Sequence, residues 1–187
     1  LAEGISPALI ENAGKMAGMP VGPLALADEV AIDLCYKINK QTEIDTGKKN
    51  ESAAAGIINK FVEELNRTGK KSKKGFYEYP DPSANAQGGK KFLWPELTKL
   101  FPPQLQQPNV EEIKKRLLYI QALEAVKCME ENIITKPADA DIGSILGWGF
   151  APYSGGVISF IDTIGLKNFV DECNLLTKKY GKRFKPT

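Results

Sequence analysis

Two segments rich in glycine and proline carry the residue types best suited to shaping a binding pocket. In the first, Gly18-Met19-Pro20-Val21-Gly22, the glycines permit backbone turns that other residues resist, and Pro20 stiffens the chain. Met19 and Val21 then present apolar side chains from a rigid loop. Such a loop suits the wall of a pocket for an apolar chain. It equally suits a corner between two helices packed in the core, and the residues alone leave both interpretations open.

Four lysines gather in another segment that could bind an anion. Lys70, Lys71, Lys73 and Lys74 precede a short alternating stretch, residues 75–79. A lysine ammonium is a flexible point charge that suits phosphate or ribose oxygens. A run of lysines in a loop is also an ordinary solvated face, so both interpretations stand.

The other residues that could do chemistry show no catalytic pattern. The chain has no histidine, the side chain whose pKa near neutrality suits general acid–base catalysis. It also has no G-x-G-x-x-G motif opening a helix after a strand, the turn that seats a dinucleotide pyrophosphate. The three cysteines lie far apart without metal-ligand spacing, which predicts buried free thiols at Cys35, Cys128 and Cys173. No paired-carboxylate pattern is seen at Glu11, Glu29, Asp139 and Asp141.

The composition limits the class of protein. The 187 residues, 42% of them hydrophobic, are enough for one large or two small globular units. A net charge of +2 is too small a basic excess for a general phosphate-binding surface, so it gives no sign of nucleic-acid binding. No stretch reaches the roughly 18–20 apolar residues of a membrane span. We therefore expect neither nucleic acid nor a membrane span.

The glycine- and proline-rich segment occurs twice, and we call residues 18–22 hinge one and residues 149–156 hinge two. In each copy a helical stretch that begins with a proline precedes the hinge, and a short apolar helix carrying an aspartate follows it. Asp28 and Asp162 are 134 residues apart, while Gly18 and Gly149 are 131 apart, so hinge two contains a three-residue insertion. A repeat this long predicts two similar helical modules. We expect the two aspartates to cap or brace the hinges through backbone N–H groups.

Apolar periodicity predicts a mainly helical chain. Helices are expected over residues 7–17, 23–38, 51–67, 109–129 and 166–180. Residues 75–79 alternate like a short extended piece, residues 80–89 are predicted to be an exposed loop, and residues 92–101 form one or two helical turns. The predicted domains are module one at residues 1–80, a linker at 81–108 and module two at 109–187.

These motifs resemble the C-terminal helical region of 3-hydroxyacyl-CoA dehydrogenases. The resemblance rests on residues 18–23, 28–30, 75–77, 124–126 and 137–143, and it covers about Gly4 to Phe184. The likeness is greatest to the large multifunctional enzymes of fatty-acid β-oxidation, which carry two such modules in tandem. It implies an all-α fold, similar to the C-terminal domain of 6-phosphogluconate dehydrogenase, in which a pseudo-twofold axis relates the two modules.

The resemblance also implies roles for individual residues. By position, Met19, Pro20 and Leu26 match residues that line the acyl cleft of the family. Leu146 matches a position near the substrate where family members often carry a bulkier aromatic residue. Lys71 matches a basic residue close to the cofactor.

The activity implied by the resemblance is oxidation of the 3-hydroxyl of an acyl-CoA to a ketone by hydride transfer to NAD. In the family the general base is a histidine oriented by a glutamate, and both lie on a nucleotide-binding domain that precedes this region. We therefore expect this chain to be an excised part of a longer enzyme and to be inactive alone. NAD would then be bound mainly by the absent domain.

The expected partners are the acyl-CoA substrate and the upstream nucleotide-binding domain of the same parent chain. The location would be cytoplasmic in a bacterium, and mitochondrial or peroxisomal in a eukaryote. The alternative function is a non-catalytic helical module for interaction or assembly. A complete small helical enzyme is disfavoured, because histidine and the dinucleotide motif are missing.

Overall fold

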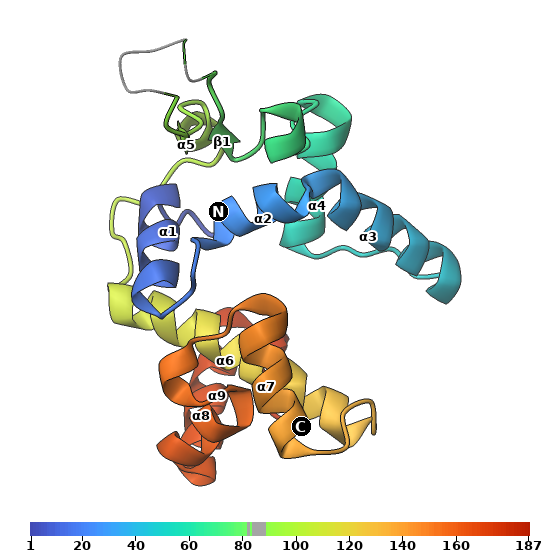
Figure 1. The fold of residues 1–187 in the computed structure, drawn as a ribbon, viewed down its shortest axis with the longest axis vertical. Helices are drawn as coiled ribbons and strands as arrows, with labels where there is room; N and C mark the ends of the chain where they lie inside the picture. Colours follow the sequence, from blue (N-terminus) through green and yellow to red (C-terminus); the bar gives the residue numbers. More distant parts are fainter. Residues whose placement is uncertain (82, 84–88) are drawn as a thin grey trace. The chain divides into compact units, whose positions relative to one another are not determined.

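The computed structural model describes residues 1–81, 83 and 89–187, and Figure 1 shows that this part of the chain is mostly helical. It divides into two compact units. Unit 1 consists of Leu1–Asn12 and Val21–Pro108, and unit 2 consists of Ala13–Pro20 and Asn109–Thr187. The chain therefore enters unit 2 for eight residues early in the sequence and returns to it at Asn109. The predicted all-α fold class is confirmed.

Unit 1 is built from short helices and one small hairpin. Its elements are α1 (Pro7–Met16), whose last turn belongs to unit 2, α2 (Pro23–Val30), α3 (Ile32–Thr46), α4 (Ala53–Asn59), a π-helical turn (Lys60–Glu64), a 3-10 turn (Lys70–Ser72), β1 (Tyr77–Glu78), β2 (Phe92–Leu93) and α5 (Leu97–Leu100). The strands β1 and β2 are antiparallel, with Tyr77 opposite Leu93.

The core of unit 1 forms around aromatic rings. Phe61 is fully buried, and its ring centroid lies 4.3 Å from that of Phe76 and 6.2 Å from that of Trp94. Leu97 of α5 is also fully buried. Aromatic packing of this kind dominates the energetics of a small core. The hairpin and α5 are therefore structural parts of unit 1.

Two predicted helices of unit 1 differ in detail from the prediction. The helix predicted over residues 23–38 breaks at Ala31, which has φ 80°, and Ile32 then donates a hydrogen bond to the carbonyl of Thr68. The helix predicted over residues 51–67 divides into α4 and the π-helical turn. At Ala31 a contact with a residue far along the chain accompanies the break, whereas the backbone from Ala53 to Glu64 stays helical throughout.

Unit 2 is formed by longer helices. Its elements are α6 (Val110–Glu130), α7 (Pro137–Trp148), a 3-10 turn (Pro152–Ser154), α8 (Val157–Ile164), α9 (Leu166–Tyr180) and a final 3-10 turn (Lys182–Phe184). The Asn109 side chain caps α6 by accepting from the N–H of Glu111 at 2.9 Å. In the core, the ring of Tyr119 on α6 stacks on Phe169 of α9 at 4.7 Å.

After each hinge, the two copies of the sequence repeat form helices of the same lengths. Helices α2 and α8 both have 8 residues, α3 and α9 both have 15, and each second copy begins 134 residues after the first. The junction residues match as well, because Ala31 has φ 80° and ψ 119° while Gly165 has φ 87° and ψ 129°. The two modules therefore share a local fold. The pseudo-twofold axis between them stays a prediction.

Other predictions compare with the described residues as follows. Unit 2 resumes at Asn109, where module two was expected to begin, but residues 89–108 belong to unit 1 and include β2 and α5. The predicted loop at residues 80–89 falls mostly on residues 82 and 84–88, which lie outside the described part. All three cysteines are free thiols, but only Cys173 is buried, whereas Cys35 and Cys128 are partly exposed. None of the described helices is both long and apolar enough to cross a membrane.

Tyr119 gives a prediction on alkaline pH. Burial raises the pKa of its phenol from 10 to about 12, with the charge of Glu172 adding to the effect. The folded state therefore keeps its proton between pH 10 and 12, where the unfolded chain loses it, so this contribution to stability is complete below pH 10 and lost as the pH rises to 12. Over that range we expect the wild type to lose about 2 kcal/mol more than Tyr119→Phe.

The measurement is urea unfolding of both proteins at several pH values from 9 upward. Equal losses in the two proteins would show that Tyr119 ionises as readily in the folded chain as in the unfolded one.

Candidate functional site

The two hinges contact each other within unit 2. A methyl group added to Gly18 would lie 2.9 Å from Cβ of Ala151, and one added to Gly149 would lie 2.8 Å from Cγ of Pro20. Gly18 is the repeat counterpart of Gly149, and Pro20 is the counterpart of Ala151. The contact is therefore reciprocal, as at an interface between two copies of one surface. The missing side chains at both glycines allow this close approach.

The residues predicted to contact substrate lie in both units. In unit 2, Met19 is partly exposed, Pro20 is exposed next to Gly149, and Leu146 is 81% exposed on the last turns of α7. In unit 1, Leu26 is partly exposed on α2. The structure thus brings Pro20 next to the residue that ends the helix of Leu146. The site assignment itself stays a prediction.

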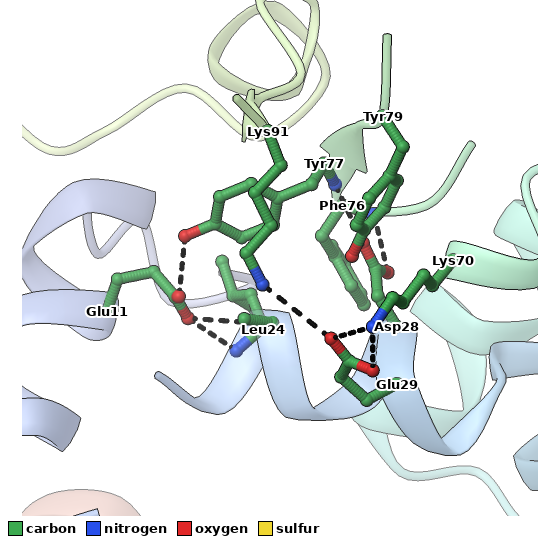
Figure 2. Close-up of polar contacts among 10 residues, drawn as sticks. Glu11, Leu24, Asp28, Glu29, Lys70, Phe76, Tyr77, Tyr79 and Lys91 are labelled. Carbon is green, nitrogen blue, oxygen red and sulfur yellow. Dashed lines mark hydrogen bonds and ion pairs between the residues drawn. The ribbon is translucent and has the colours of Figure 1, made fainter. Parts of the chain in front are cut away.

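A buried carboxylate closes hinge one onto the next helix. Glu11 on α1 is 3% exposed, and its Oε1 accepts from the N–H groups of Leu24 at 2.5 Å and Ala25 at 3.4 Å. Its Oε2 accepts from the hydroxyl of Tyr77 at 2.6 Å. Figure 2 shows this carboxylate between the first turn of α2 and the ring of Tyr77. Burial raises the pKa of that phenol above its usual range.

A second buried carboxylate holds the start of the hairpin. Asp28, 1% exposed, accepts from the N–H groups of Phe76 at 2.8 Å and Tyr77 at 2.9 Å, and from the hydroxyl of Tyr79 at 3.0 Å (Figure 2). Burial raises the pKa of Asp28, although these hydrogen bonds oppose the shift. The expectation that Asp28 braces the hinge was wrong. It fixes residues 76–79, while Glu11 braces the hinge.

Arg67 holds the same segment from another direction. It is buried, and its guanidinium donates to the carbonyls of Gly75 at 2.7 Å and Tyr77 at 3.2 Å and to the carboxylate of Glu78 at 2.9 Å. The guanidinium carbon also lies 4.0 Å from the ring centroid of Trp94. Asp28 and Arg67 together fix the backbone that follows the lysine-rich turn, so the position of that turn is well defined.

The lysine-rich turn presents all four of its side chains to solvent. The turn is closed by reciprocal hydrogen bonds between the backbones of Gly69 and Lys74. Lys70 pairs with Glu29, which Lys91 also approaches at 3.9 Å (Figure 2), and Lys73 pairs with Asp81. Among the carboxylates that the structure describes, none forms an ion pair with Lys71. Its exposed ammonium is therefore accessible to an anion, although its charge also acts on the carboxylate of Asp33.

Unit 1 also contains an apolar cavity of about 260 Å³, lined among others by Ala27, Cys35 and Phe76. None of the predicted substrate residues lines it. The repeat counterparts of Ala27 and Cys35 are Ile161 and Phe169, which pack in unit 2 in the same core as Tyr119 of α6. In unit 2, the residues that correspond to these lining residues therefore pack against α6. For this reason we do not assign it to the substrate.

The residues that sequence reasoning missed are Glu11, Arg67 and Asp141. A signal for two of them was present in the repeat. Glu11 and Asp141 each follow the proline that opens their helix, Pro7 or Pro137, by four residues. An acidic residue in the same place in both copies, on a helix that precedes a glycine-rich hinge, indicates a shared structural role. Arg67 carries no such signal, because its partners are backbone carbonyls of an irregular segment.

A family model matches the first part of the chain. Residues 1–79, which contain hinge one, Glu11, Asp28 and the lysine-rich turn, match the model of the 3-hydroxyacyl-CoA dehydrogenase C-terminal domain. This part of the chain is therefore similar to that domain. The matched residues include four of the five predicted site residues. The fifth, Leu146, lies outside the match.

Relatives match all or most of the chain. It is 35% identical over 186 residues to the fatty acid oxidation complex subunit alpha of Shewanella baltica, and 38% identical over 169 residues to the subunit of the same name from Vibrio cholerae. These matches cover 100% and 90% of this chain but only 26% and 23% of the relatives. The chain thus spans about a quarter of the length of the curated relatives it matches.

Solved structures share the fold of the C-terminal domain. The dehydrogenase part of multifunctional enzyme 1 from C. elegans matches 97% of this chain and 40% of its own, with a TM-score of 0.64 and 22% identity. The 3-hydroxybutyryl-CoA dehydrogenase of Escherichia coli matches 99% of this chain and 53% of its own, with a TM-score of 0.68 and 16% identity. At these identities the likeness supports the fold alone.

Proposed function

We propose that this chain works as the C-terminal part of an NAD-dependent 3-hydroxyacyl-CoA dehydrogenase of fatty-acid β-oxidation, where it completes the substrate cleft. The observation that carries the proposal is the family match of residues 1–79. This segment contains hinge one and the buried carboxylate of Glu11, which binds the start of α2. Relatives named as fatty acid oxidation complex subunits support the pathway. Because those relatives are bacterial, we propose that the protein is located in the cytoplasm.

In this proposal the residues of hinge one contact the acyl chain. Met19 and Pro20 are partly or wholly exposed and belong to a loop whose backbone is tied at both ends, so they can present apolar surface without rearranging. Leu146 of the same unit, and Leu26 of unit 1, are the other residues proposed to contact the substrate. Binding energy from such remote contacts orients the reacting end of a substrate.

The chain's own residues fit only an outer contact with NAD. The exposed ammonium of Lys71 forms no ion pair with a described carboxylate and suits a phosphate or ribose oxygen. The chain has no glycine-rich dinucleotide motif and no histidine to act as the base. NAD, when bound, accepts the hydride. We propose that an upstream nucleotide-binding domain of the same protein holds the cofactor and supplies the base.

The test compares the isolated chain with the full-length gene product that carries it. With 3-hydroxybutyryl-CoA and NAD, we expect turnover by the full-length protein and none above the buffer control by the purified 187-residue chain. Turnover by the chain alone would refute the proposal that an upstream domain holds the cofactor and supplies the base. A folded full-length protein that is inactive with 3-hydroxyacyl-CoA substrates and does not bind acyl-CoA would instead favour a non-catalytic assembly module.

A further inference from the structure

Glu11 and Asp141 occupy the same place in the two copies of the repeat. The Glu11 carboxylate accepts from the N–H groups of Leu24 and Ala25 at the start of α2. The Asp141 carboxylate accepts from the N–H groups 134 residues later, those of Ile158 at 2.7 Å and Ser159 at 3.1 Å, at the start of α8. Each carboxylate thus satisfies backbone donors that a helix leaves without partners at its N-terminus. Each closes the hinge that separates its own helix from the next.

The carboxylates of Glu11 and Asp141, which we call the two clamps, differ in the hydroxyl group from which each accepts a further hydrogen bond. Asp141 also accepts from the hydroxyl of Ser159, on the helix it already caps, at 2.7 Å. Glu11 instead accepts from the hydroxyl of Tyr77, which lies on β1 more than sixty residues away along the chain. Glu11 therefore connects α1, α2 and the hairpin, whereas Asp141 connects only α7 and α8.

The contacts of Glu11 fix the downstream end of hinge one. Gly22 lies directly against the Glu11 carboxylate, and no side chain fits at that position. The upstream end is tied separately, because the N–H of Met19 donates to the carbonyl of Gly14 at 3.1 Å. Met19, Pro20 and Val21 therefore form a short bridge between two fixed points, of which Glu11 supplies the second.

We propose that Glu11 is a positioning residue that sets where Met19 and Pro20 lie in the substrate cleft. The inference rests on the function proposed above and adds to it a residue that touches neither substrate nor cofactor. Loss of the carboxylate frees the end of the loop at Gly22, so that only the bond of Met19 to Gly14 and the packing against hinge two still hold Met19 and Pro20. Small displacements of positioning groups are enough to change substrate binding markedly.

The first measurement is steady-state kinetics of full-length variants. We expect Glu11→Ala to raise the KM for the acyl-CoA about tenfold and to leave the KM for NAD within about twofold. Glu11→Gln keeps an oxygen that can accept from Leu24, so its KM should return most of the way to the wild-type value. Asp141→Ala is the matched comparison, since it removes the corresponding clamp from α8; it should lower thermal stability and raise that KM less than Glu11→Ala does.

The second measurement is amide hydrogen exchange on the 187-residue chain, which needs no activity. In Glu11→Ala, exchange should rise about tenfold in peptides that cover residues 20–25, and Asp141→Ala should affect residues 156–159 instead. Unchanged exchange at residues 20–25 would overturn the inference whatever the enzyme does. An inactive wild-type enzyme would overturn the proposed function, while the exchange result would still decide whether the clamp exists.

Two further outcomes are decisive. A stable, active Glu11→Ala enzyme with an unaltered KM for acyl-CoA would show that Glu11 serves structure only. If Glu11→Ala fails to fold, Tyr77→Phe replaces it, because this change removes one of the two anchors and leaves the bond to Leu24. We expect a rise in KM of about threefold for Tyr77→Phe, and no change would again overturn the inference.

Discussion

Replacing Asp28 with alanine is expected to lower the free energy of unfolding by about 3–5 kcal/mol, because two buried backbone N–H groups and a tyrosine hydroxyl lose their acceptor at once. The donors are those of Phe76, Tyr77 and Tyr79, all held by the one carboxylate. Water cannot easily replace it, since Asp28 is 1% exposed. Urea unfolding at neutral pH measures the loss.

Asp162 provides the matched control for this change. It is the repeat counterpart of Asp28, but it is exposed and its carboxylate accepts no hydrogen bond from the described residues. Asp162→Ala should therefore change the free energy of unfolding by less than about 0.5 kcal/mol. Similar losses for the two variants would show that the contacts of Asp28 with the hairpin contribute little.

The second large effect concerns Met19. In the full-length enzyme, Met19→Asp is expected to raise the KM for acyl-CoA at least about tenfold while the melting temperature and NAD binding stay nearly unchanged. A charge would enter an apolar contact without a partner, but the side chain is partly exposed, so the fold does not depend on it. Steady-state kinetics and thermal unfolding of this one variant measure both quantities.

The repeat supplies a contrast for Met19 as well. Its counterpart in hinge two is Phe150, which is 1% exposed and part of the core of unit 2. Phe150→Asp should prevent unit 2 from folding, since it buries an unpaired charge. If Met19→Asp also collapses the melting temperature, then Met19 is a packing residue like Phe150, and its assignment to the acyl wall is wrong.

Much of the fold could be predicted from the sequence because the signals are local. The apolar spacing of residues 166–180 and Gly181 after them predicted α9 to the residue, and Asn109 was correctly identified at the start of α6. The repeat predicted two similar modules, and the lengths of α2, α3, α8 and α9 confirm their likeness.

The remaining features could not be predicted, because they depend on contacts between distant residues. The break at Ala31 accompanies the bond from Ile32 to Thr68, and no pattern near residue 31 indicates it. Asp28 was identified as structural, but its partners lie 48 and more residues away, and the sequence does not show which backbone groups lack acceptors. The substrate and cofactor residues came from resemblance to a family and stay predictions.

Residues Ala13–Pro20, near the start of the chain, belong to unit 2, so the folding of unit 2 depends on both halves of the sequence. Ala17, which lies in that segment, is fully buried in the core formed by residues of the second half. Without the second half of the chain this segment would have no core to pack in, and without the first half that core would lack Ala17. The core of unit 2 is therefore complete only when both halves of the chain are present.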